Sequence, residues 1–174
     1  MNERDSANSS TGPLMAAIAE EDLVAVRAYI TRFHREIDAA LREGDSAKLK
    51  EFDAHIRVTT YGLFQLPAYR GVVYRGATLP EHAARRYVPG SVIQEPAFIS
   101  ASADPARRFP GNVQYVIHSV NGRLVRALAD DPEELEVVFF TQTKFKVLAV
   151  DEGSTQGELT VYLAEIPDPR LIRS

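Results

Sequence analysis

The hydrophobic spacing changes once along this 174-residue chain, and that change limits the folds open to it. Before Pro67 the apolar residues recur every three or four positions, which is typical of helices with one buried face. After Pro67 they gather in short runs rich in β-branched and aromatic residues, which is typical of strands. Helices that precede the strands, instead of alternating with them, favour an α+β fold over a doubly wound α/β fold.

The element boundaries follow from the same pattern. A first helix is expected from Leu23, with apolar residues at positions 23, 26, 30, 33, 37 and 41. Gly44 ends this helix, and Asp45 or Ser46 can cap a second one that runs to about Pro67. A short helix is predicted at 80–87, because proline suits a first helical turn. Strands are expected at 72–74, 97–102, 113–120, 137–140, 145–150 and 159–166.

The length fits one domain of residues 14–174 after a flexible, polar lead-in of residues 1–13. Hydrophobic residues make up 45% and charged residues 25%, which argues against a mostly disordered chain. No window approaches the roughly 20 apolar residues that span a bilayer, and no signal-peptide pattern is found. We therefore expect a soluble domain, which could be cut from a longer polypeptide, and no membrane partner.

Composition excludes several kinds of chemistry. Twenty Lys and Arg residues against 24 Asp and Glu residues give a net charge of −4, which leaves only a local basic patch to attract nucleic acid. Without cysteine there is no thiol nucleophile and no cysteine-ligated zinc. The four scattered histidines show no metal-ligand spacing, so no metal is expected. Glycine-rich dinucleotide, P-loop and G-x-S-x-G motifs do not occur.

Three local patterns can carry chemistry. Arg75 lies in a strand that is otherwise predicted to be buried, so it needs either an internal carboxylate or a bound phosphate as partner. Gly76 would let a ligand approach the backbone. Ser100 and Ser102 share one strand face, either solvated or orienting a catalytic carboxylate. Glu134 and Glu136 share a face before four apolar residues, either as a solvated junction or as acids in a low dielectric.

The order of these three motifs resembles the Arg-Ser-Glu class of mono-ADP-ribosyltransferases. The motifs are Arg75 in Y-R-G, Ser100 in F-I-S-A-S, and Glu134-x-Glu136 before V-V-F-F. The likeness is greatest to the bacterial actin-modifying and polymorphic-toxin branch of this class. Tyr29, followed by the segment 37–42, resembles the N-terminal helix of that family, and residues 111–119 resemble the strand after its active-site loop. The resemblance covers most of residues 20–150.

The resemblance implies an α+β fold with N-terminal helices and two packed, roughly perpendicular sheets, with NAD+ as substrate in the cleft between them. Arg75 would hold the NAD+ phosphates, and the backbone beside Gly76 would meet the nicotinamide amide. Phe109 would pack on nicotinamide, and Tyr29 would be a further nucleotide contact. His34 falls where relatives often have another aromatic, so packing around the nucleotide is expected to differ.

The resemblance also implies catalytic roles. Ser100 would steady Glu136, and Glu136 would grip the ribose and favour the oxocarbenium-like state. Glu134 would orient and help deprotonate the acceptor, and a glutamate there goes with arginine as acceptor. The family usually has Ser-Thr-Ser where this chain has Ala101 between its serines, so activity is expected with changed NAD+ affinity.

Chemistry supports these residue types independently. Nicotinamide leaves NAD+ as a neutral molecule, so bond cleavage needs no general acid, unlike ordinary glycoside hydrolysis. One carboxylate can stabilise the positive ribose. An arginine acceptor is protonated at neutral pH, so a second carboxylate is needed to activate it.

Several functions stay open at this point. The leading hypothesis is the toxic domain of a secreted or delivered bacterial effector that modifies protein arginine in the target-cell cytoplasm, with a cognate immunity protein as partner. The same residues would serve an NAD glycohydrolase that depletes NAD+. Transfer to a nucleic-acid acceptor is a further alternative, and so is a silent domain that only binds a partner or nucleotide.

Overall fold

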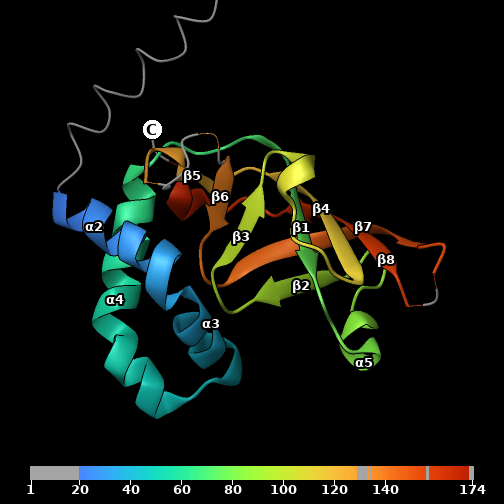
Figure 1. The fold of residues 1–174 in the computed structure, drawn as a ribbon, viewed down its shortest axis with the longest axis horizontal. Coiled ribbons are helices and arrows are strands. Elements are labelled where there is room, and N and C mark those ends of the chain that lie inside the picture. Colours follow the sequence, from blue (N-terminus) through green and yellow to red (C-terminus); the bar gives the residue numbers. More distant parts are fainter. Residues whose placement is uncertain (1–19, 129–132, 134, 156, 173–174) are drawn as a thin grey trace, which may run out of the picture.

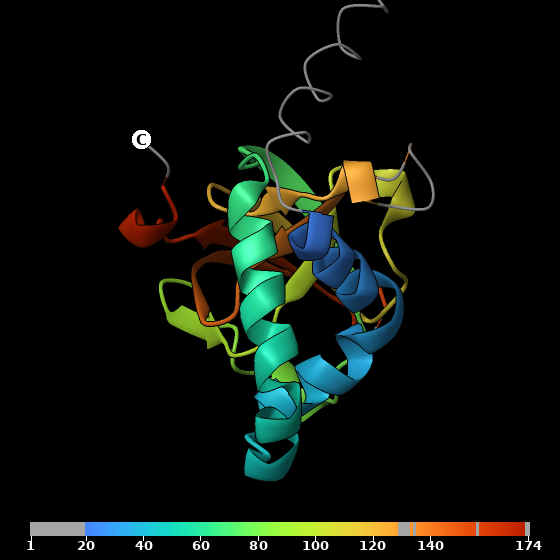
Figure 2. The same ribbon diagram turned by 90° about the vertical axis from the view of Figure 1, so that its left-hand side faces the viewer.

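The fold combines a helical layer with strands that follow it in the chain (Figure 1). The computed structural model describes residues 20–128, 133, 135–155 and 157–172. The predicted lead-in of residues 1–13 lies outside these residues. Turned by 90°, the molecule shows the helices side by side over the strands (Figure 2). The predicted α+β class is confirmed.

A glycine stop and an aspartate cap separate two helical runs. Gly44, with φ of 67°, ends the first helical run, and the Asp45 carboxylate accepts N–H groups of the next helix at 3.0 and 3.2 Å. The predicted glycine stop and aspartate cap are therefore confirmed.

The first run is interrupted by a π-helical turn that the sequence did not indicate, and this turn changes its direction (Figure 2). The elements are α2 (Glu20–Ala28), η1 (Tyr29–Phe33), α3 (His34–Glu43) and α4 (Ser46–Gln65).

All six predicted strands are present, together with two that were not predicted. The strands are β1 (Gly71–Ala77), β2 (Val92–Glu95), β3 (Ile99–Ser102), β4 (Val113–Ser119), β5 (Arg123–Leu124), β6 (Glu136–Phe139), β7 (Thr143–Glu152) and β8 (Leu159–Glu165). They pair in the order β2-β7-β8-β4-β1-β3-β6-β5, and the unpredicted β2 and β5 form its two edges. Neighbours are antiparallel except β4 and β8. Shorter helices are α5 (Glu81–Ala84), η2 (Pro105–Arg107), η3 (Arg126–Leu128) and η4 (Pro169–Leu171).

Two groups of strands meet at a narrow seam. The group β2-β7-β8-β4-β1 joins the group β3-β6-β5 through one residue pair, Tyr74 with Ser102. The two groups then fold against each other, because the rings of Phe139 in β6 and Phe145 in β7 pack edge to face at 5.3 Å. The predicted two packed layers of strands are thus hydrogen-bonded into one bent sheet.

Strand β6 is buried on both faces and lies between two hydrophobic clusters. Val137 and Phe139 pack into the cluster between the strand groups. Val138 and Phe140 point to the other side, where they meet Tyr29 and the helices. Alternate residues of a strand face opposite sides, so one apolar run serves both clusters. The helical layer of α2, η1, α3 and α4 therefore packs against the β3-β6-β5 group, and the cleft lies beside it.

Candidate active site

The cleft has a volume of about 620 Å³ and lies between one face of η1 and α3 and the strands β1, β3 and β6. Five of the seven predicted site residues line it, from four separate parts of the chain. Among its lining residues are Thr31, His34, Arg35, Asp38, Arg42, Arg75, Gly76, Ser100, Ser102, Arg107, Arg108, Phe109 and Glu136. This volume is within the range of small-molecule sites.

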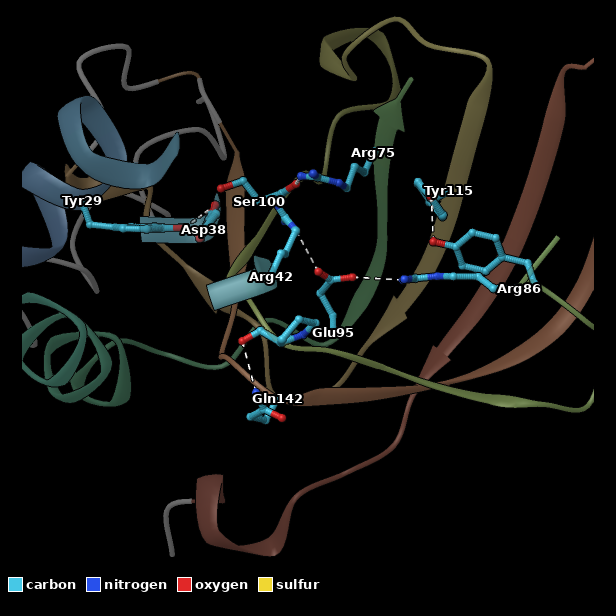
Figure 3. A network of polar contacts seen from close by, with 11 residues as sticks. Tyr29, Asp38, Arg42, Arg75, Arg86, Glu95, Ser100, Tyr115 and Gln142 are labelled. Atoms are coloured by element: carbon cyan, nitrogen blue, oxygen red, sulfur yellow. Dashed lines mark hydrogen bonds and ion pairs between the residues drawn. The ribbon is translucent and has the colours of Figure 1, made fainter. Parts of the chain in front are cut away.

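Arg75 is held at the seam between the strand groups. Its Nη1 donates to the backbone carbonyl of Ser100 at 2.7 Å (Figure 3). Burial and the neighbouring charge of Arg42 lower the pKa of Arg75, against the opposing effect of Glu95 and Asp38. Within the described part of the chain, no carboxylate lies within ion-pair distance of its guanidinium. The internal ion pair considered above is therefore not found among the described residues.

Serines and a glutamate lie on one face of paired strands. Glu136, the first residue of β6, lies directly opposite Ser102, whereas Ser100 lies opposite Val138. All of these side chains point to the helical side, where the cleft opens. Ser102 is 9% exposed, and its hydroxyl accepts the N–H of Asp104 at 3.0 Å.

Glu134, which the sequence predicts beside Glu136, lies outside the described residues, so its place stays a prediction. The stabilising contact predicted between Ser100 and Glu136 stays a prediction. The register adds Ser102 as the serine directly across from that glutamate.

The loop after β3 packs directly on β1. A Cβ at Gly76 would lie 1.6 Å from the carbonyl oxygen of Phe109, and one at Gly111 would lie 2.3 Å from that of Ala77. The close approach that Gly76 permits is therefore, in this structure, that of its own loop. The Phe109 side chain is 67% exposed and lines the cleft, where an aromatic ligand ring can reach it.

Tyr29 lies behind the cleft wall, outside the set of lining residues. Its side chain is 2% exposed, and its ring packs on Phe98 with centroids 4.8 Å apart. Its hydroxyl donates to Asp38, which does line the cleft (Figure 3). Burial, Asp38 and then Glu136 raise the pKa of Tyr29, so the tyrosine stays neutral. In this arrangement Tyr29 contacts the cleft through Asp38.

A polar stripe on the helix was not predicted as part of the site. Thr31, Arg35, Asp38 and Arg42 recur at intervals of three or four and face the cleft. Arg42 pairs through Nε with Glu95 Oε1 at 3.0 Å, and Arg86 pairs with Glu95 Oε2 at 3.1 Å (Figure 3). The helical spacing of these residues was a usable signal, but polar positions on a helix are normally solvated.

The described residues contain neither a metal-binding cluster nor a membrane-spanning helix. No group of three or more His, Cys, Asp or Glu side chains there could hold a metal ion. No helix in the same ranges is long and apolar enough to cross a membrane.

Solved structures similar to this chain include bacterial ADP-ribosyltransferases, and the chain shares their fold. HopU1 from Pseudomonas syringae pv. tomato superposes with a TM-score of 0.78 at 20% identity, over 94% of this chain and 84% of that one. The type III effector XopAI from Xanthomonas axonopodis pv. citri reaches 0.77 at 26% identity, over 94% and 74%. A family model for NAD:arginine ADP-ribosyltransferases matches residues 3–169, and the chain belongs to this family.

Sequence relatives have the same family description. The NAD(+)–protein-arginine ADP-ribosyltransferase Tre1 from Pseudomonas putida is 35% identical over 161 residues, which is 90% of this chain and 32% of Tre1. Tre1 from Serratia proteamaculans is 30% identical over 165 residues, or 94% of this chain and 36% of the relative. The chain spans between 18% and 48% of the length of the sequence relatives compared.

Proposed function

We propose that this chain is a catalytic domain that transfers ADP-ribose from NAD+ to an arginine side chain of a protein. The observation that carries the proposal is the meeting of Arg75, Ser100 and Glu136 in one cleft. They come from strands separated in sequence, and their order along the chain is the one in which the sequence resembles the Arg-Ser-Glu motifs.

The nucleotide would lie along the seam. Arg75 and Arg42 both line the cleft, and two adjacent guanidinium groups suit the diphosphate of NAD+. The backbone beside Gly76 would meet the nicotinamide amide, and the exposed ring of Phe109 would pack on the nicotinamide. Tyr29 would act on nucleotide binding indirectly, through Asp38.

Bond cleavage would depend on Glu136. The glycosidic bond between ribose C1′ and the nicotinamide nitrogen breaks, and its electron pair neutralises the pyridinium ring. Positive charge is left on the ribose. A half-buried carboxylate at the mouth of β6 stabilises this charge more strongly than water would. Ser100, on the same strand face, would steady that carboxylate.

Transfer would need a second acid. An arginine nitrogen attacks C1′ and must lose a proton, which Glu134 would accept. The names of the Tre1 relatives specify protein arginine, and Vis from Vibrio splendidus was solved with agmatine, a guanidinium compound. These relatives support arginine as the acceptor. The type III effector XopAI supports a delivered effector, for which a cognate immunity protein is the expected partner.

The test is incubation of the purified domain with NAD+ labelled in its adenylate part and with bacterial and eukaryotic lysates. Wild type should label a protein band, Glu136→Ala should neither label protein nor consume NAD+, and Glu134→Ala should cleave NAD+ with little transfer. Label found only as free ADP-ribose would indicate an NAD glycohydrolase, and labelled RNA or DNA would indicate a nucleic-acid acceptor. No consumption of NAD+ by wild type would refute both enzyme hypotheses.

A further inference from the structure

Glu95 places one carboxylate between Arg42, which lines the cleft, and Arg86, and Glu95 itself lines a second cavity. Its Oε1 accepts a hydrogen bond from Arg42 Nε at 3.0 Å, and its Oε2 accepts one from Arg86 Nη2 at 3.1 Å. The Glu95 side chain is only 12% exposed, whereas those of the arginines are 43% and 44% exposed. The more buried acid is therefore the fixed member, and it restrains two more mobile cations.

The backbone around Glu95 explains why the acid is fixed. Glu95 is the last residue of the edge strand β2 and pairs with Thr143 of β7. The neighbouring Gln94 side chain donates to the Gln142 carbonyl at 3.2 Å and to its side-chain oxygen at 2.9 Å. Two successive residues thus tie this end of β2 to the start of β7. The carboxylate is carried by the edge strand β2, and Arg42 is carried by helix α3 (Figure 3).

The two arginines differ in what they can reach. Arg42 lines the cleft and also a second cavity of about 440 Å³, while Arg86 lines only the second cavity. Arg42 uses Nε for Glu95, so the N–H groups of its two terminal nitrogens remain for a ligand. Its charge lowers the pKa of Arg75, which places the two cations within electrostatic reach. Arg86 instead lies over the Tyr87 ring, 5.0 Å from its centroid.

We propose that Glu95 is a positioning residue for nucleotide binding, which acts by orienting the guanidinium of Arg42 beside Arg75. The inference rests on the proposed function, because it takes NAD+ as the ligand of the cleft. A long arginine side chain loses rotamer freedom when it binds a phosphate. Because Glu95 already restrains Arg42 through Nε, the Arg42 side chain loses less rotamer freedom when a phosphate binds. Glu95 therefore strengthens the binding of an anion although it is an anion itself.

Charge and orientation make opposite predictions for Glu95→Gln. Loss of one negative charge beside the cleft should by itself tighten the binding of a phosphate ligand. Loss of orientation should weaken it. We expect the dissociation constant of NAD+, measured by calorimetry, to rise about fivefold, the size of a partly exposed ion pair. The KM for NAD+ should rise with it while kcat stays close to that of wild type, since the reacting atoms are not touched.

Two further variants test whether Glu95 acts on NAD+ affinity through Arg42 or through Arg86. Arg86→Met removes the other partner of Glu95 and should change NAD+ affinity less than Glu95→Gln does. In an Arg42→Ala background, Glu95→Gln should no longer weaken NAD+ binding, because only the effect of its charge remains. Melting temperatures of all variants, measured without ligand, separate this effect from a loss of folding.

Several results would overturn the inference. Tighter NAD+ binding by Glu95→Gln would show that its charge outweighs its orienting effect. An undiminished effect in the Arg42→Ala background would show that Glu95 does not act through Arg42. Failure of the wild-type chain to bind NAD+ would instead refute the proposed function, and this inference with it. Wild-type binding with an unchanged Glu95→Gln variant would refute the inference alone.

Discussion

Tyr29 donates its hydroxyl to both carboxylate oxygens of Asp38, at 3.1 and 3.2 Å, although the two residues are nine positions apart in the chain. In a straight α-helix that separation is about two and a half turns, which puts the side chains on opposite faces. The π-helical turn between α2 and α3 redirects the chain and lets them meet. π-Helical turns are frequent at functional sites, and this one lies beside the cleft.

Asp38 should make stability depend on pH. Burial raises the pKa of Asp38 to about 6, although Arg42, Tyr29 and Arg75 act in the opposite direction. Because the folded chain then holds this proton more tightly than the unfolded chain, the contribution is fully present below pH 4 and is lost as pH rises to about 6. The free energy of unfolding in urea should show this fall in wild type but not in Asp38→Asn. Equal slopes in both proteins would contradict the assignment.

Removal of the Tyr29 hydroxyl should move this transition. The hydrogen bond from Tyr29 lowers the pKa of Asp38, so Tyr29→Phe should raise that pKa above its wild-type value. The stability loss should then extend to higher pH. A carboxyl titration followed by NMR would measure the shift directly. A lower pKa of Asp38 in Tyr29→Phe would be the opposite of this expectation.

The two serines of β3 should have separable effects. Ser102 is buried and accepts the N–H that begins the following loop, so Ser102→Ala should cost about 1 kcal/mol of stability. Ser100 is less buried, and its proposed role is to steady Glu136. Ser100→Ala should therefore lower kcat, by roughly tenfold, with little change in melting temperature. A fall in kcat confined to Ser102→Ala would assign the role to the serine opposite Glu136.

Much of the fold could be predicted from periodicity. The change at Pro67 separated helices from strands, and the Gly44 stop and Asp45 cap have strong local causes. The four residues of β2 and the two of β5 are short and form strands by pairing with β7 and β6, so no local pattern indicates them. The predicted helix at 80–87 is regular only over Glu81–Ala84.

The site could be predicted only where residues lie in compact motifs. Arg75, Ser100 and Glu136 each belong to a recognisable local pattern and line the same cleft. The pair between Arg42 and Glu95 joins residues 53 apart in the chain, and only the folded arrangement brings them together. The π-helical turn likewise depends on packing around Tyr29, because the spacing of apolar residues there suits an ordinary helix.

Gly62 should tolerate no larger residue. A Cβ there would lie 2.6 Å from the carbonyl oxygen of Asp22 and 2.6 Å from Cγ2 of Val26, where α4 crosses α2. Gly62→Ala should destabilise the domain by about 1–3 kcal/mol, although alanine favours a helix. Lys50→Ala, at an exposed position of the same helix, should change stability by less than about 0.5 kcal/mol. Chemical denaturation measures both, and a stabilised Gly62→Ala would contradict the packing described.

Arg75→Lys should weaken both nucleotide binding and the seam. Lysine keeps the charge but lacks the fork that grips a phosphate, and it loses the Nη1 bond to the Ser100 carbonyl. The KM for NAD+ should rise by roughly tenfold or more, and the melting temperature should fall. Arg108→Lys makes the same exchange at an exposed cleft residue and should have a smaller effect. Equal effects of the two exchanges would mean that charge alone matters at position 75.

The single-pair seam between Tyr74 and Ser102 gives the cleft two walls that share one ladder pair between β1 and β3. Arg75 belongs to one strand group, and Glu136 belongs to the other. Besides that pair, the walls are joined by the hydrogen bond from Arg75 to the Ser100 carbonyl and by the packing of Phe139 on Phe145. The relative placement of the cleft residues therefore depends on side chains as well as on the backbone ladder.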